Sequence, residues 1–439
     1  MARLAVLVVG HGDYPLRRGV AAAEGMATWL RGQGVAVDVA PEPVVDHAQA
    51  TAAARRLVGG LYDGVVYLLA SWLECPTAVA AVRELEHVPF AVWGFGQYEE
   101  GGERTSSGSM VGLVVLKASL ERMGYRFAWV LGDEDDGGAR ARLLDFARVA
   151  GAMATLKRTR VGLVGYASMG MYPGTMDPVL ARRWVGPETV HVDTYDLVRG
   201  MDDAAAERVD RFHERRAELL DVGGGCSAEE LGVAARMFAA LGALVEEHGL
   251  DAVNVKCQYE LSKGLGCTAC LALSVLAEEG VVCACEGDMP LAVSMCLLAG
   301  VTGGAVAYGD LLDVSGDELV LSSCGFLPPS MASGRPQVVP HRHEGFAGPL
   351  VSGVGQEGAA TLVRLFETRG GFGLHVAEGT GLPTQPRMGY FPALRVALAG
   401  DADAFLAHAK SQHYAFAYGC WGRALALYAE LAGLELIAD

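Results

Sequence analysis

Short apolar runs alternate with longer, alanine-rich stretches through the N-terminal third of the chain. Apolar runs typical of buried strands lie at residues 4–9, 35–39, 64–69, 90–93 and 127–131. Stretches with apolar residues at helical spacing lie between them, for example at 18–32, 48–57 and 78–85. Strands that alternate with helices in this way form parallel sheets covered by helices, so residues 1–155 are predicted to be a doubly wound α/β domain.

The same pattern starts again near residue 156. A run at 160–164 leads into a loop rich in Gly, Ser and Met at 165–174, and further runs follow at 189–192, 252–257 and 281–285. Helical stretches such as 229–247 and 267–279 separate these runs. Residues 156–335 are therefore predicted to be a second doubly wound α/β domain.

Beyond residue 335 the pattern changes to short alternating segments with many glycines, for example at 360–366 and 373–376. Such segments favour antiparallel strands in a barrel or sandwich. The fold class is thus α/β, with two doubly wound domains followed by a C-terminal antiparallel β-barrel-like domain over 336–439. That last domain is expected to close with a terminal helix at 423–434.

Two carboxylates stand at the end of one predicted strand, in the sequence GVVCACEGDMP at 280–290. Glu286 and Asp288 directly follow the apolar run, and a helix is predicted next, because Asp288 can cap it and Pro290 suits its first turn. Ligands in open α/β sheets bind at the carboxyl ends of the strands. This strand tip is the first place to look for a functional site.

Composition and net charge indicate what kind of protein this is and which partners it can bind. The chain has 439 residues, of which 51% are hydrophobic and 20% charged, so it is expected to be folded with a large buried interior. Its formal net charge of -17 argues against binding to nucleic acid or anionic membranes, and favours small neutral molecules or metal cations as partners. The apolar stretches are too short for a membrane span and the chain shows no signal peptide, so a soluble cytoplasmic protein is expected.

Seven of the ten cysteines lie in one region, namely Cys257, Cys267, Cys270, Cys283, Cys285, Cys296 and Cys324. Their surroundings are rich in Ala, Leu and Val and lack a Gly-rich knuckle. This favours use as small buried apolar residues over a disulfide framework or a zinc or iron–sulfur site.

Four polar residues at predicted strand ends form a candidate site: Glu260, Glu286, Asp288 and His413. Carboxylates with one imidazole make an oxygen-rich ligand set that suits Mn²⁺ or Mg²⁺ and is compatible with Zn²⁺ or Co²⁺.

Each of these residues also has a structural interpretation. Asp288 can act only as a helix cap, and Glu286 can be a solvated loop residue. Glu260 can form a surface salt bridge with Lys256 or Lys263, and a lone histidine such as His413 is more often structural than a ligand.

Three segments resemble the L-fucose and L-arabinose isomerase superfamily: CACEGDMPLAVSMCLLAGVTGGAVAYGD, SSCGFLPP and HYAFAYGCWGRALALYAELAGLELI. The resemblance implies that the metal-binding Asp of fucose isomerase-like members falls on Asp288 and their C-terminal His on His413. The Glu of the EGD motif in the arabinose isomerase branch falls on Glu286. Glu260 is the nearest candidate for the remaining carboxylate, whereas a strict alignment places Thr268 there.

The resemblance also implies an activity and an assembly. We expect a Mn²⁺-dependent (or other divalent-metal-dependent) aldose–ketose isomerase that acts on a small sugar through an enediolate, with Glu260 and Asp288 as catalytic residues. A homotrimer or homohexamer is implied. Many relatives carry His where Ser323 stands, so the resemblance implies either an atypical substrate or a changed activity. The alternatives are an epimerase or lyase acting on another polyol or sugar acid, and a non-catalytic sugar-binding protein on the same scaffold.

Overall fold

The computed structural model describes residues 2–341 and 343–439. The chain folds into two compact units. The first unit comprises Met1–Ala154 and Arg423–Gly433, and the second comprises Thr155–Gly422 and Leu434–Asp439.

The first unit is built on a parallel five-stranded sheet in the order β2-β1-β3-β4-β7. Its strands are β1 (Arg3–Val9), β2 (Ala36–Val39), β3 (Gly64–Leu69), β4 (Phe90–Gly94) and β7 (Ala128–Leu131). Its helices are α1 (Arg17–Gly32), α2 (His47–Val58), α3 (Cys75–Glu84), α4 (Ser109–Arg122), α5 (Gly137–Leu156) and α13 (Gly422–Ala432), and a hairpin joins β5 (Tyr98–Glu100) to β6 (Glu103–Thr105). The predicted strand–helix alternation and parallel sheet are confirmed here.

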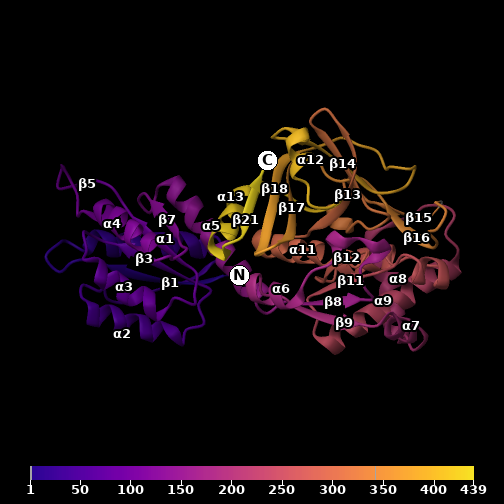
Figure 1. Cartoon of the computed structure of the whole chain (residues 1–439), viewed down its shortest axis with the longest axis horizontal. Coiled ribbons are helices and arrows are strands. Elements are labelled where there is room, and N and C mark those ends of the chain that lie inside the picture. The colour runs from indigo at the N-terminus through magenta and orange to yellow at the C-terminus, as the bar shows by residue number, and fades with distance from the viewer. Residues whose placement is uncertain (1, 342) are drawn as a thin grey trace. The chain divides into compact units, whose positions relative to one another are not determined.

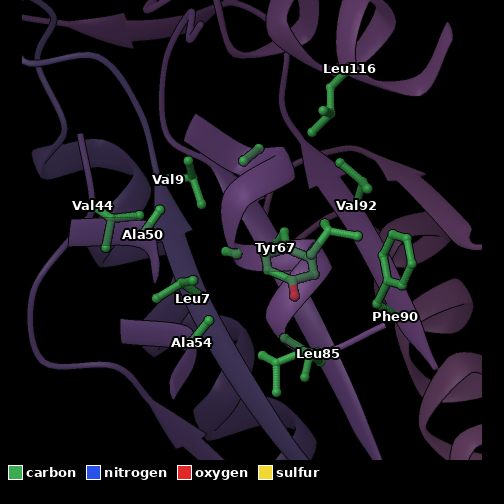
Figure 2. Packing of buried hydrophobic residues seen from close by; sticks show 14 of the residues in the cluster. Leu7, Val9, Val44, Ala50, Ala54, Tyr67, Leu85, Phe90, Val92 and Leu116 are labelled. Atoms are coloured by element: carbon green, nitrogen blue, oxygen red, sulfur yellow. The ribbon is translucent and has the colours of Figure 1, made fainter. Parts of the chain in front are cut away.

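The core of this unit lies between the sheet and its helices. Figure 2 shows Leu7 and Tyr67 from the sheet near Ala50 and Ala54 of α2. Small alanines on the inner face of α2 let the helix lie close to the sheet, which explains its alanine-rich sequence. The helix α13 joins this unit from the far end of the sequence, and Arg423 in it forms an ion pair with Asp145 of α5.

The second unit contains a parallel sheet in the order β12-β11-β8-β9. Its strands are β8 (Arg160–Val164), β9 (Glu188–Val192), β11 (Ala252–Val255) and β12 (Val282–Cys285). The helices that follow these strands are α6 (Pro178–Trp184), α7 (Thr194–Asp202), α8 (Ala206–Leu219), α9 (Ala228–His248), α10 (Cys270–Ala277) and α11 (Met289–Thr302), with short helical turns at η1 (Ser168–Gly170), η2 (Tyr172–Gly174), η3 (Glu260–Leu265) and η4 (Pro329–Met331). This second parallel sheet was also predicted.

A large antiparallel sheet occupies the rest of the second unit, in the order β17-β20-β13-β14-β19-β18-β21. Its strands are β13 (Ala307–Ser315), β14 (Glu318–Ser322), β17 (Gly358–Thr368), β18 (Gly371–Leu382), β19 (Ala393–Leu398), β20 (His413–Tyr418) and β21 (Glu435–Ala438), and a smaller sheet joins β10 (Asp221–Val222), β15 (Gln337–Pro340) and β16 (Pro349–Ser352). The helix α12 (Ala402–His408) precedes β20. Because β17 also pairs with β18, the pairings return to their starting strand, as they do in a barrel.

Two strands of this antiparallel sheet, β13 and β14, lie before residue 335 in the chain. They pair with β20 and β19, which come from the C-terminal segment. The division into three domains at residues 155 and 335 stays a prediction. Among the described residues, no helix combines the length and the apolarity that crossing a membrane requires.

The helix α11 connects the two sheets of this unit. It packs against β12 of the parallel sheet and against β17 and β20 of the antiparallel sheet (Figure 1). Its first turn therefore lies where the carboxyl end of β12 meets the start of β20.

Candidate metal centre

The strand β12 ends in a sharp turn that carries both predicted carboxylates. Glu286 and Gly287 have φ values of 68° and 64°, in the left-handed region. A Cβ atom on Gly287 would lie 2.1 Å from the carbonyl oxygen of Tyr166, so only glycine fits there. The Gly287 amide donates to Asn254 Oδ1 at 3.0 Å. The turn thus fixes the directions of the side chains at 286 and 288.

Asp288 is fully buried, and both of its carboxylate oxygens have partners. Its Oδ1 accepts from the Leu291 amide at 3.0 Å and caps α11, as its sequence context predicted. Its Oδ2 accepts from Arg364 Nη1 at 2.8 Å and lies 2.9 Å from His413 Nδ1. Burial raises the pKa of Asp288, but the Arg364 charge and the His413 hydrogen bond lower it to about 2. Asp288 is therefore an anion that holds two neighbouring side chains in place.

The other nitrogen of His413 faces two further carboxylates. His413 Nε2 lies 3.1 Å from Asp310 Oδ1 and 3.4 Å from Glu286 Oε2, yet it makes no hydrogen bond to any residue that the structure describes. Asp310 reaches this position because β13 pairs with β20 in a register that sets Asp310 opposite His413. Directly opposed residues of antiparallel strands point to the same face. We call Glu286, Asp310 and His413 the strand-tip cluster.

The protonation of His413 follows from these neighbours. Burial lowers the pKa of His413, but Asp288, Asp310 and Glu286 raise it well above its usual range. In the metal-free protein the ring is therefore an imidazolium that balances the surrounding negative charge.

The strand-tip cluster fits a divalent metal ion. One donor atom from each of its three residues lies within 4.8 Å of the others. Two carboxylates and one imidazole are ligands that Mn²⁺, Co²⁺ and Zn²⁺ accept. His413 Nε2 is a buried nitrogen without a hydrogen bond, and the side chain of Asp310 is 33% exposed, which leaves an open side for a ligand.

Glu260 begins the helical turn η3, which follows the strand β11, and it has a different partner. It forms an ion pair with Lys256, and its side chain is 44% exposed whereas that of Lys256 is 1% exposed. The Lys256 ammonium also lies 4.0 Å from the centre of the Tyr166 ring. Of the four sequence-predicted residues, the structure brings Glu286, Asp288 and His413 together and pairs Glu260 with Lys256. The metal and catalytic roles assigned to these four residues stay predictions.

Thr268 and Ser323, the two positions at which the resemblance implies a departure from the family pattern, make local contacts. Thr268 Oγ1 lies 3.0 Å from His341 Nε2, and Ser323 Oγ donates to the Phe326 carbonyl at 2.6 Å. Next to Ser323, Cys324 Sγ lies 3.9 Å from Glu286 Oε1.

Two residues of the site did not emerge from the sequence, namely Asp310 and Arg364. Arg364 is 1% exposed and stands among apolar residues of β17, in the sequence ATLVRLF. A charged residue inside an apolar strand signals a buried partner, and that signal was available.

The loop at 165–174 covers this strand tip. The Ser168 amide donates to the Glu286 carbonyl at 2.8 Å, and Ser168 Oγ donates to Gln258 Oε1 at 2.6 Å. Arg364 Nη2 donates to the Pro173 carbonyl at 2.7 Å. The loop thus holds the backbone of Glu286 and the side chain of Arg364 together.

Among known proteins, several curated sugar isomerases are similar in sequence to this chain. The chain is 27% identical over 333 residues to a sulfoquinovose isomerase from Alkalicoccus urumqiensis, which covers 74% of each chain. It is 26% identical over 404 residues to the sulfoquinovose isomerase of Priestia megaterium, covering 89% of each chain. An L-arabinose isomerase from Geobacillus kaustophilus is 25% identical over 343 residues, which is 72% of this chain and 67% of the relative.

These similarities support an aldose–ketose isomerase and the superfamily indicated by the sequence motifs, with no fucose isomerase among these relatives. No family model matches the chain. A solute-binding protein from Burkholderia multivorans aligns with 69% of the chain and 94% of its own at 12% identity and a TM-score of 0.19, which carries no argument about the fold.

Proposed function

We propose that the protein is a divalent-metal-dependent aldose–ketose isomerase whose metal is held by Glu286, Asp310 and His413. The observation that carries the proposal is the buried His413 Nε2, which faces two carboxylate oxygens at 3.1 and 3.4 Å without a hydrogen bond. When bound, a divalent ion such as Mn²⁺ would stabilise the negative charge that develops on the sugar oxygens during isomerisation.

Asp288 is the positioning residue of this site. Its hydrogen bond to His413 Nδ1 at 2.9 Å holds the ring so that Nε2 points at Glu286 and Asp310. Arg364 balances the charge of Asp288 and keeps it ionised. A carboxylate with a pKa of about 2 and both oxygens engaged is a weak base, so the proton is carried by another group.

Isomerisation of an aldose moves one proton from C2 to the carbonyl carbon C1 and a second proton from the C2 hydroxyl to the oxygen on C1. We assign the C2-to-C1 transfer to Glu286 or Asp310, because both carboxylates lie beside His413 Nε2 and the side chain of Asp310 is 33% exposed on the open side of the cluster. Glu260, the base predicted from the sequence, is the alternative. It differs from the other two in having Lys256 as an ion-pair partner, which lowers its pKa.

The relatives suggest which sugars to try. Two of the relatives above are named for sulfoquinovose and one for L-arabinose, so sulfoquinovose is the first substrate to test and L-arabinose the second. The proposal retains the cytoplasmic location and the homotrimeric or homohexameric assembly expected from the sequence.

Metal content and proton exchange test this function. The protein is stripped with a chelator, reloaded with Mn²⁺, and incubated with each aldose in D₂O while exchange at C2 is followed by NMR. We expect Asp310→Asn and Glu286→Gln each to weaken Mn²⁺ binding by at least about tenfold and to abolish exchange. Asp313→Asn is the matched control, because Asp313 lies on the same strand β13 and is exposed.

The outcomes separate the alternatives. Wild-type Mn²⁺ affinity in both Asp310→Asn and Glu286→Gln would refute the metal site. Loss of exchange in Glu260→Gln with unchanged Mn²⁺ binding would make Glu260 the base. Binding of sugar without any C2 exchange in the loaded wild-type protein would favour a sugar-binding protein over an isomerase.

A further inference from the structure

A second group of histidines and a carboxylate lies on the antiparallel sheet, outside the strand-tip cluster. His375 of β18, His408 at the end of α12 and Asp439 just after β21 contact one another. In Figure 1 the C-terminal end lies beside α12 and β18. One donor atom from each of these three residues lies within 4.8 Å of the others. We call this group the β18 cluster.

The carboxylate of Asp439 lies between the two imidazoles. His375 Nε2 is 2.7 Å from Asp439 Oδ2, and His408 Nδ1 is 3.0 and 3.1 Å from the two oxygens. In tetrahedral zinc sites, Zn–N and Zn–O bonds of about 2.0–2.2 Å place the donors roughly 3.3 Å apart. The His408–Asp439 distances therefore lie within about 0.3 Å of this spacing, and His375 Nε2 and Asp439 Oδ2 need to separate by roughly 0.6 Å to admit an ion.

The side chains around the β18 cluster bury His375 and leave His408 accessible to solvent. His375 is fully buried, its Nδ1 lies 2.6 Å from the Tyr414 hydroxyl, and its ring centre is 4.8 Å from that of Phe405. A hydrogen bond to the far nitrogen is the arrangement that orients metal-bound histidines. The side chain of His408 is 47% exposed, which gives an ion a route in and leaves room for a water ligand.

We propose that His375, His408 and Asp439 form a second site for a transition-metal ion of the zinc type. Two imidazoles and one carboxylate are softer than the strand-tip donors and suit Zn²⁺, Co²⁺ or Ni²⁺ better than Mn²⁺. The ion joins β18, α12 and the segment after β21, so it stabilises the packing of β21 on β18. This site is independent of the proposed isomerase activity.

Cobalt titration tests this site, because Co²⁺ bound by nitrogen and oxygen donors in a tetrahedron absorbs visible light strongly. The chelator-stripped full chain is used in the Asp310→Asn background, so that the strand-tip cluster binds weakly. We expect one equivalent of Co²⁺ to produce the tetrahedral spectrum, Zn²⁺ to displace it, and the thermal midpoint to rise with added Zn²⁺.

His408→Asn is the decisive variant, since His408 is half-exposed and its replacement leaves the buried His375 in place. We expect this change to lower Co²⁺ affinity at least about tenfold and to remove the Zn²⁺-dependent rise in midpoint. His87→Asn, at an exposed histidine of the first unit, is the matched control.

Two results would overturn the proposal. One is the absence of a tetrahedral Co²⁺ spectrum in the Asp310→Asn protein. The other is an unchanged titration in His408→Asn. Failure of the isomerase proposal would be recognised by a different result. Mn²⁺ binding would be unaltered in the strand-tip variants, while the Co²⁺ titration would still respond to His408→Asn.

Discussion

The strand-tip cluster and the β18 cluster use the same residue types in opposite proportions. At the strand tip, one imidazole faces three carboxylates, those of Glu286, Asp288 and Asp310. In the β18 cluster, a single carboxylate, Asp439, is shared by two imidazoles. Both clusters are anchored by a fully buried histidine.

This difference sets opposite pKa shifts in the two buried histidines. Burial lowers the pKa of both rings. At His413 the three carboxylates outweigh burial and the pKa rises well above its usual range. At His375, burial outweighs the single partner Asp439 and the pKa falls. Because burial lowers the pKa of both rings, the opposite directions follow from the charges around them: three carboxylates at His413, and at His375 a single carboxylate opposed by His408 and Lys410.

The largest effect we predict is the loss of folding stability when the carboxylate hydrogen-bonded to the buried histidine of each cluster is replaced. Asp288→Asn leaves the Arg364 guanidinium buried without its ion-pair partner, since both side chains are 1% exposed. We expect a loss of about 3–5 kcal/mol in the free energy of unfolding. Asp439→Asn removes a hydrogen-bond partner from the half-exposed His408 and from the neutral His375. We expect this change to lower the free energy of unfolding by about 1–3 kcal/mol. Urea unfolding of the metal-free proteins measures both, and equal losses would contradict the comparison.

The second prediction concerns the pH dependence of stability in the metal-free protein. Because the folded-state pKa of His413 is raised, its contribution is fully present below the unfolded pKa of about 6.5 and is lost as pH rises through the folded value. The folded-state pKa of His375 is lowered, so the unfolded chain binds more protons and stability is lost as pH falls through about 6.5. Each slope is at most about 1.4 kcal/mol per pH unit.

Variants test this assignment directly. His413→Gln should flatten the alkaline side of the stability profile, and His375→Gln should flatten the acid side. Chemical unfolding midpoints across a pH series, with a chelator present, provide the profile. A His413→Gln protein that keeps the alkaline loss would show that another group carries it.

The sequence predicted the parts of the fold and site that depend on local pattern. Alternating apolar runs and helical stretches indicated both parallel sheets, and the EGD turn followed by Pro290 indicated the strand end and the helix cap at Asp288. Because carboxylates at strand ends meet at one edge of a sheet, Glu286 and Asp288 were expected at a site.

The missing parts depend on pairing between distant segments. Asp310 enters the site only through the β13–β20 register, which sets it opposite His413. Arg364 comes from β17, which packs against α11, and it reaches Asp288 at the start of that helix. Neither register nor helix packing is encoded in the spacing of residues near 310 or 364. Glu260 had two interpretations in the sequence, and the structure supplies the ion pair with Lys256 that one of them predicted.

The smallest effect we predict is in the protons released when metal binds. His413 must lose its proton before Nε2 can hold an ion, so Mn²⁺ binding at the strand tip should release about one proton per chain near neutral pH. His375 has a lowered pKa, so Zn²⁺ binding at the β18 cluster should release less than the strand tip does. Titration calorimetry in two buffers of different ionisation enthalpy, at one pH, counts the protons. The Asp310→Asn protein gives the proton release of the β18 cluster alone, and the His408→Asn protein gives that of the strand tip alone. Equal proton release in these two variants would mean that the charges around the two histidines do not control their protonation.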